Sequence, residues 1–87
     1  MDGPDDRPVN WDQWNRKHIL EDHPERHIQE HEVDEVLTDP GRVEEYRHSR
    51  DSYVVRGTTL SGRVLIVAWV EAFGGRYPVH ARPEEWK

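Results

Sequence analysis

The alternation of hydrophobic and polar positions over residues 52–82 predicts a small antiparallel sheet. Residues 52–59 are rich in β-branched and aromatic side chains, and residues 63–70 form an almost continuous apolar run, which is typical of a buried strand. Gly74 and Gly75 supply a two-residue hairpin turn, because both central positions of a type I′ turn need a positive φ. The chain returns as a third strand over residues 76–82.

The N-terminal half has the signals of two helices. Asn10 can cap a helix with Gln13 as its capping-box partner, so we expect a first helix over residues 12–21. Pro24 suits the first position of a second helix. That helix must end before the Asp39-Pro40-Gly41 segment, because proline restricts the residue before it and glycine permits a turn.

Two helices followed by three strands predict an α+β fold, in which two N-terminal helices pack on one face of a small antiparallel sheet. Residues 1–9 hold two prolines, a glycine and three aspartates, and we expect a disordered lead-in there that ends at a short strand or turn near Val9. Residues 10–87 then form a single domain. Residues 42–51 are a polar connector that could begin a further edge strand, and Trp86 could dock back onto the domain.

Because side chains on a strand alternate between faces, the predicted sheet has an apolar face and a polar one. In the last strand Tyr77, Val79 and Ala81 share the apolar face. The opposite face carries Arg56, Arg76, His80 and Arg82. Cations beside an imidazole are what a phosphate-binding or RNA-cleaving surface needs. The same arginines are equally compatible with a solvated face that only keeps the sheet soluble.

The composition limits the size of the core and indicates the cellular compartment. Hydrophobic residues make up 33% of the chain and charged residues 34%, so the core is small, and four tryptophans should supply much of its buried area. The chain has no cysteine, which excludes disulfides and thiolate metal sites and fits a reducing compartment. No apolar segment approaches the length of a membrane span. These features predict a cytoplasmic protein without a membrane partner.

Charge is distributed unevenly along the chain. The formal net charge is −6, which argues against a general nucleic-acid binder. Residues 1–51 hold 15 acidic and 7 basic side chains, whereas residues 52–87 hold 3 acidic and 5 basic ones. A weakly basic sheet beside an acidic half is compatible with a local RNA site, and equally with an acidic surface that meets a basic partner.

The histidines offer two kinds of chemistry. His23, His27 and His31 lie four residues apart, and two imidazoles at that spacing can share Zn²⁺ with a carboxylate. Pro24 places His23 outside the helix, however, and the chain lacks a His-Glu-x-x-His motif, so we predict neither a metal nor a cofactor. His18 follows Lys17 on the tryptophan-rich first helix. Its imidazole can exchange a proton with a ribose hydroxyl near neutral pH.

The succession of several short motifs resembles the BrnT-type toxins of bacterial type II toxin–antitoxin systems. The motifs follow one another from Trp11 to Arg82. They are Trp11-Asp12, Asn15-x-x-His18-Ile19, the 32–40 segment Glu-Val-Asp-Glu-Val-Leu-x-Asp-Pro, the 53–67 segment Tyr-x-Val-x-Gly-x-Thr-x-x-Gly-Arg-x-Leu-x-Val, and Val79-x-Ala81-Arg82. The resemblance implies a RelE-like two-layer fold, RNA-cleaving activity and a cognate antitoxin that inhibits it. His18, Arg63 and Arg82 match the family's pattern, and Lys17 lies beside its basic position.

The first functional hypothesis is therefore a ribonuclease toxin that cleaves RNA without a metal. The 2′-hydroxyl would attack the adjacent phosphate, with His18 and His80 as acid and base in either order and Arg82 completing the catalytic set. The phosphate-binding candidates are Lys17, Arg56, Arg63 and Arg76. The alternative is a shortened, non-catalytic relative that keeps the fold and binds another protein. Both hypotheses allow the protein to form a homo-oligomer or a hetero-oligomer.

Overall fold

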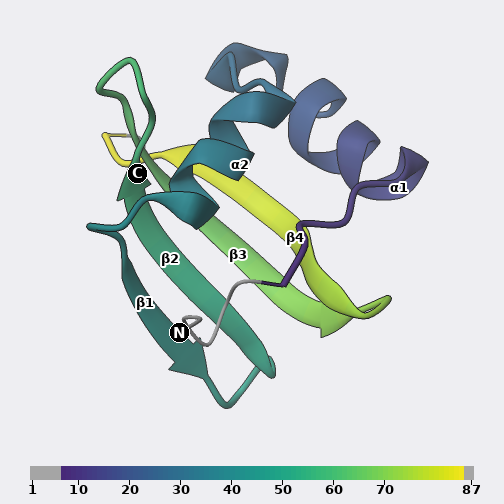
Figure 1. The fold of residues 1–87 in the computed structure, drawn as a ribbon. Helices are drawn as coiled ribbons and strands as arrows, with labels where there is room; N and C mark the ends of the chain where they lie inside the picture. The colour runs from purple at the N-terminus through teal and green to yellow at the C-terminus, as the bar shows by residue number, and fades with distance from the viewer. Residues whose placement is uncertain (1–6, 86–87) are drawn as a thin grey trace.

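The computed structural model describes residues 7–85 and places a four-stranded antiparallel sheet behind short helical segments (Figure 1). The strands lie side by side in chain order. They are β1 (Val43–Arg47), β2 (Ser52–Thr58), β3 (Val64–Ala72) and β4 (Gly75–Pro83). The three strands β2, β3 and β4 and the turn between the last two confirm the sequence prediction. The fourth strand, β1, lies in the polar connector over residues 42–51, where the sequence indicated only that an edge strand could begin.

The predicted architecture of two N-terminal helices on a small sheet, in a RelE-like two-layer arrangement, is wrong. The sheet has four strands, and the helical part consists of four short segments. These are α1 (Gln13–Arg16), the π-helical turn η1 (Lys17–Glu21), the 3₁₀ turn η2 (Pro24–Arg26) and α2 (Glu30–Thr38). Only α2 lies across the sheet, where it contacts β2 and β3, whereas α1 and η1 run beside β4 (Figure 1).

The N-cap of the first helix lies two residues later than predicted. Asp12, not Asn10, is the N-cap: its carboxylate accepts hydrogen bonds from the backbone N–H groups of Trp14 (2.9 Å) and Asn15 (3.1 Å). The Asn15 side chain in return accepts from the Asp12 N–H at 2.9 Å. A carboxylate at the cap thus satisfies two of the N–H groups that a helix leaves unpaired.

The second predicted helix is interrupted after one turn. Pro24 opens only the 3₁₀ turn η2, and His27 then adopts a left-handed conformation with φ of 52°. This conformation ends a helix. The helix α2 starts afresh after Gln29, which forms a capping box with Glu32. The expected single helix, which begins at Pro24 and ends before Asp39, is therefore broken at residues 27–29, whereas its predicted end is confirmed by Thr38 as the last residue of α2.

The sequence signal for strand β1 was weak because the strand lies at the edge of the sheet. Its residues alternate between polar and apolar only weakly, since neither face of an edge strand needs to be fully buried. Tyr46 pairs with Tyr53 across β1 and β2, and the two rings lie 4.9 Å apart. The turn that follows β1 uses Asp51 at φ of 51° instead of a glycine, so the sequence carries little hairpin signal there.

The core lies between α2, the Ile19 region and one face of the sheet. Its fully buried apolar residues are Ile19, Ile28, Val33, Val36, Leu37, Val55, Leu65, Val67, Trp69 and Ala81. The helix α2 approaches the sheet most closely at Gly57. A methyl group there would lie 3.0 Å from the Val36 carbonyl oxygen and 3.1 Å from Cγ1 of the same residue.

The N-terminal segment is partly integrated into the sheet. Residues 1–6 of the predicted lead-in, and Trp86, lie outside the described residues. Val9 forms a parallel bridge with Arg76, and Arg7 packs over the Trp69 ring at 5.6 Å. Residues 7–9 therefore pack on the sheet, and the bridge at Val9 agrees with the short strand or turn expected there. None of the helices within residues 7–85 has the length and apolar run that crossing a bilayer requires.

The close approach at Gly57 gives a first prediction. Gly57→Ala should lower the free energy of unfolding by about 1–3 kcal/mol, because the added methyl group presses against backbone that cannot move independently. Gly41→Ala is the matched control, since its methyl group would meet only ordinary contact, at 3.6 Å from Asp39. Urea unfolding of both variants measures the difference. Equal stabilities would show that α2 does not press on the sheet at this point.

Candidate functional site

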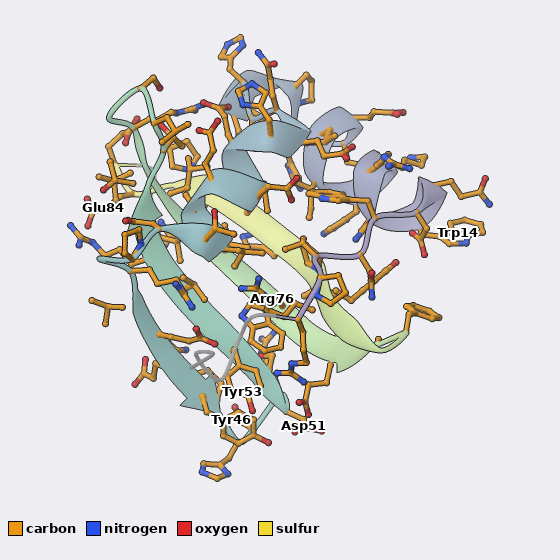
Figure 2. All side chains as sticks on the ribbon, in the orientation of Figure 1. Trp14, Tyr46, Asp51, Tyr53, Arg76 and Glu84 are labelled. Carbon is orange, nitrogen blue, oxygen red and sulfur yellow. The ribbon has the colours of Figure 1, made fainter. Side chains whose placement is uncertain are left out.

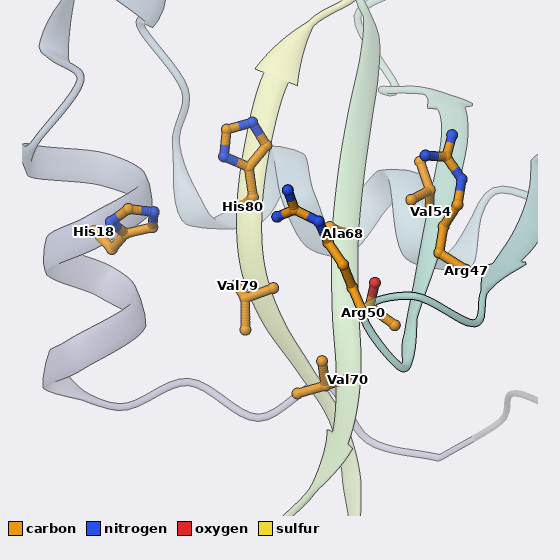
Figure 3. A pocket seen from close by; sticks show the side chains of 9 residues that line it. His18, Arg47, Arg50, Val54, Ala68, Val70, Val79 and His80 are labelled. Atoms are coloured by element: carbon orange, nitrogen blue, oxygen red, sulfur yellow. The ribbon is translucent and has the colours of Figure 1, made fainter.

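The sheet face opposite α2 is open and carries a groove of about 680 Å³ (Figure 3). Val54, Ala68 and Val70 form its apolar floor on β2 and β3. His18 from η1 and His80 from β4 stand at one end of the groove. Arg47 and Arg50 stand toward β1, and Arg50 extends over β3 in Figure 3. Among the described residues that line the groove, none is acidic.

The two histidines of the groove face each other. Their ring centroids lie 6.5 Å apart, with the planes tilted by 48°. A third imidazole, that of His23, meets the edge of His18 at 5.9 Å. The carboxylate of Asp22 lies 3.7 Å from Nδ1 of His18. The structure thus brings together the two predicted catalytic imidazoles, and one of them, His18, lies beside a carboxylate.

The environment of His80 favours its neutral form. Partial burial lowers the pKa of His80 below its ordinary value of 6.5, and the nearby charges of Arg26, His18, Arg82 and His23 lower it further. A neutral imidazole at physiological pH can accept a proton. His80 therefore has the properties of a general base.

An irregularity in strand pairing decides which side chains of β4 reach this face. Trp69 pairs with Pro78, but its neighbour Ala68 pairs with His80, so Val79 is an extra residue in β4. Such a bulge reverses the alternation of faces on one side of it. His80 consequently stays on the open face as predicted, together with the following cation Arg82.

Arg76 lies on the other face, which makes its predicted role as an RNA-binding cation wrong in position. Its side chain is 3% exposed and lies on the helix side of the sheet (Figure 2). Nη1 donates to the Leu37 carbonyl at 2.7 Å, and Nε and Nη2 donate to the Arg7 carbonyl at 3.1 and 3.0 Å. Arg76 therefore joins the N-terminal segment and the end of α2 to the sheet.

Arg63 is also placed in a structural position and not in the groove. Its guanidinium donates to the carbonyl oxygens of Arg26 and His27, the latter at 2.6 Å, and lies 3.3 Å from the Glu32 carboxylate. These bonds fix the left-handed turn between η2 and α2. The prediction that Arg63 faces the RNA phosphate does not agree with these contacts.

The remaining predicted cations lie around the open face. Arg56 on β2 and Arg82 on β4 both lie opposite Ile66 of β3, one on each side of it, and Arg56 pairs with the carboxylate of Glu84. The Lys17 ammonium is 2.7 Å from Asp22, on the outer side of η1. Neither Arg56 nor Lys17 lines the groove. None of the four predicted phosphate-binding residues therefore lies next to the two imidazoles.

Sequence reasoning missed the cations that do lie near them. Arg26 donates from Nη1 to the Ala81 carbonyl at 3.0 Å, next to His80, and its charge acts on that imidazole. Arg47 ends β1, Arg50 lies in the β1–β2 turn, and both line the groove. The pairing of residue 47 with Ser52, which also lines the groove, puts Arg47 on the open face, but the sequence indicated only that an edge strand could begin here. No comparable sequence signal points to Arg26.

No group of three or more histidine, aspartate or glutamate side chains within residues 7–85 is arranged to hold a metal ion. Of the three histidines considered for zinc, His31 instead contacts Glu35 and Gln29, at 3.1 Å each, and His27 occupies the left-handed turn. Proton transfer and electrostatic stabilisation are thus the chemistry that these side chains can themselves supply.

A family model described as a domain of unknown function, DUF4258, matches residues 16–74, which is more than half of the chain. The chain belongs to the DUF4258 family. The matched DUF4258 segment spans η1, α2 and β1 to β3 and includes His18, whereas His80 and Arg82 lie beyond it on β4. No curated protein and no solved structure matches the chain.

The two buried or half-buried arginines give a stability prediction. Arg76→Met and Arg63→Met should each lower the free energy of unfolding, by about 3 and about 2 kcal/mol, because carbonyl groups lose charged donors. Arg56→Met removes an arginine of the exposed ion pair with Glu84 and should change stability by less than about 1 kcal/mol. Urea unfolding compares the three; a cost at residue 56 as large as at 76 would contradict this division.

The lowered pKa of His80 gives a pH prediction. Because the folded state binds the proton less readily than the unfolded state, stability is lost as the pH falls through 6.5 and toward the folded pKa, and nothing is lost above 6.5. The wild type should therefore lose more stability between pH 7.5 and pH 5 than His80→Gln, which cannot titrate. Urea midpoints at the two pH values test this, and parallel pH dependence of both proteins would contradict it.

Proposed function

We propose that this DUF4258 protein is a metal-independent endoribonuclease of a toxin–antitoxin pair, acting in the cytoplasm. The observation that carries the proposal is the pair of imidazoles, 6.5 Å apart, at the end of a groove without acidic lining. The resemblance of its motifs to BrnT-type toxins supports the same activity and adds a cognate antitoxin as partner. RNA cleavage through the 2′-hydroxyl needs only a base, an acid and cations near the phosphate.

In the proposed reaction one phosphate lies between the two rings. Each imidazole can then stand one hydrogen bond, about 2.8 Å, from a different oxygen of the reacting nucleotide. Neutral His80 takes the proton of the 2′-hydroxyl as its oxygen attacks phosphorus. Protonated His18, beside the Asp22 carboxylate, gives a proton to the departing 5′-oxygen. The products are a 2′,3′-cyclic phosphate and a free 5′-hydroxyl.

The cations near the site have separate tasks in this scheme. Arg82 and Arg26 act on His80 from its own end of the groove and can stabilise the charge that builds on the phosphate. Arg47 and Arg50 lie along the groove, where the backbone of the substrate would continue. Their guanidinium groups suit phosphate oxygens, because the planar fork donates two parallel hydrogen bonds.

One observation favours the second candidate, a protein-binding module. The floor of the groove is apolar, with Val54, Ala68 and Val70 turned away from the core. An apolar strip with a charged rim is also the pattern of a protein interface. The two functions are compatible in one molecule if a partner covers the groove and blocks the histidines. An RNA cleavage assay distinguishes a catalytic role of the imidazoles from a purely protein-binding role of the groove.

The test is RNA cleavage by the purified protein in excess chelator, with and without ribosomes. The wild type should produce fragments ending in 2′,3′-cyclic phosphate. His18→Ala, His80→Ala and the His80→Ala/Arg82→Ala double variant should each be about 10²–10⁴-fold slower, the usual contribution of acid–base catalysis. His31→Ala is the matched control, because it removes an exposed imidazole on α2 far from the groove.

The outcomes separate the two candidates. Loss of cleavage in the site variants, with the control unchanged, would support the endoribonuclease. A folded wild type that cleaves no RNA under either condition would refute it and leave the binding module. Cleavage that persists in all the histidine variants would place the active site elsewhere.

A further inference from the structure

An exposed aromatic residue lies immediately beside the imidazole pair. Trp14 is 67% exposed, although the four tryptophans were expected to supply buried area. It projects from the periphery of the molecule in Figure 2. A shallow hollow of about 230 Å³ separates it from β4. The hollow is lined by Trp14, Asn15, His18, Tyr77 and Val79.

The hollow is continuous with the groove. His18 and Val79 line both, so the imidazole stands between the two spaces. The exposed surface of the hollow is mostly apolar. A nucleotide with its phosphate between the two imidazoles would therefore direct a neighbouring base toward the indole of Trp14.

The helical turn that carries Trp14 is held against β4 by hydrogen bonds. Asn15, the next residue, is 3% exposed, and its side-chain amide donates to the Asn10 carbonyl at 3.0 Å and to the Pro78 carbonyl at 3.1 Å. The Asp12 cap accepts from the Trp14 N–H at 2.9 Å and from the Tyr77 hydroxyl at 2.9 Å. These bonds fix the helix turn against β4 on both sides of Trp14.

An exposed aromatic ring on a fixed helical turn, next to the proposed phosphate site, is suited to stacking a nucleobase. Every base has a π-face, so such stacking tolerates any sequence, and it requires a base that is not already stacked on both faces. In a duplex both faces of an internal base are occupied. The tilted Phe73 and Tyr77 rings, 5.3 Å apart, extend the aromatic surface on the far side of the hollow.

We propose that the hollow between Trp14 and Val79 binds the base next to the cleaved phosphate, and that the substrate is consequently single-stranded RNA. This inference rests on the proposed function for the position of the phosphate. It adds a base-binding residue that lies outside the catalytic set and outside the DUF4258 match, which begins at residue 16.

The test uses binding, so that it does not depend on turnover. A fluorescent 2′-O-methyl oligonucleotide cannot be cleaved through the 2′-oxygen, and its affinity is measured by anisotropy as a single strand and as a duplex. Trp14→Ala should weaken single-strand binding by roughly 5- to 100-fold, the range for removing one stacked base. Trp14→Phe should keep most of the affinity, and binding of the duplex should be unchanged by either variant.

Leu60→Ala is the matched control, because Leu60 is also large, apolar and 89% exposed, but lies on the β2–β3 turn. Equal single-strand affinity of wild type and Trp14→Ala would overturn the inference while leaving RNA cleavage untouched. An equal loss for duplex and single strand would overturn it too, and so would a wild type that binds neither oligonucleotide. Selective loss with Trp14→Ala in a protein that does not cleave RNA would support the base site and refute the catalytic proposal.

Discussion

The shift in pairing between β3 and β4 is the constraint on which the rest of the open face depends. With Val79 as the extra residue, His80 and Arg82 face the groove while Arg76 and Pro78 face the core. Uninterrupted alternation through β4 would have put Arg76 on the same side as His80. It would also have left the carbonyl groups of Leu37 and Arg7 without their donor. One additional residue thus builds the anchor of the N-terminal segment and the candidate site at the same time.

The arginines of this chain fall into two groups that composition cannot separate. Arg63 and Arg76 bind backbone carbonyls and hold the loops in place. Arg47 and Arg50 line the groove. A guanidinium has five donors in a fixed geometry, so it satisfies several carbonyls as readily as it binds a phosphate. In a chain with few apolar residues, this use of arginine replaces part of the contribution that a larger core would make.

Sequence patterns predicted the parts of the fold whose burial is strong. Strands β2, β3 and β4 were found because their apolar positions recur with a period of two, and the turn before β4 because of Gly74 and Gly75. Strand β1 was indicated only as the start of an edge strand within a polar connector, because an edge needs little burial. The first helical stretch was predicted at almost its observed bounds, residues 12–21 against 13–21, although its cap is Asp12 and not Asn10. The break between η2 and α2 was missed because the left-handed conformation of His27 depends on tertiary contacts. His27 is held there by Arg63, far away in sequence.

The candidate site was predicted in outline but not in detail, for a related reason. His18 and His80 meet as expected, whereas Arg76 was placed on the wrong face because alternation was assumed to be unbroken. Pro78 was the available signal: a proline within a strand occurs at an edge or at a bulge. Trp14 was expected to supply buried area together with the other three tryptophans, but a single turn beside an edge strand leaves one face uncovered and its indole is exposed.

The acidic character of the whole chain does not determine the potential at the groove. Several carboxylates of the helical half are paired with cations, as Glu30 is with Arg16 and Glu32 with Arg63. They belong to α2, which covers the opposite face of the sheet. At physiological ionic strength charges are screened beyond about 8 Å. An anion at the imidazoles therefore responds mainly to nearby groups, which are the Asp22 carboxylate beside His18 and the cations Arg26, Arg82 and the groove arginines, so a net charge of −6 is compatible with a local site for phosphate.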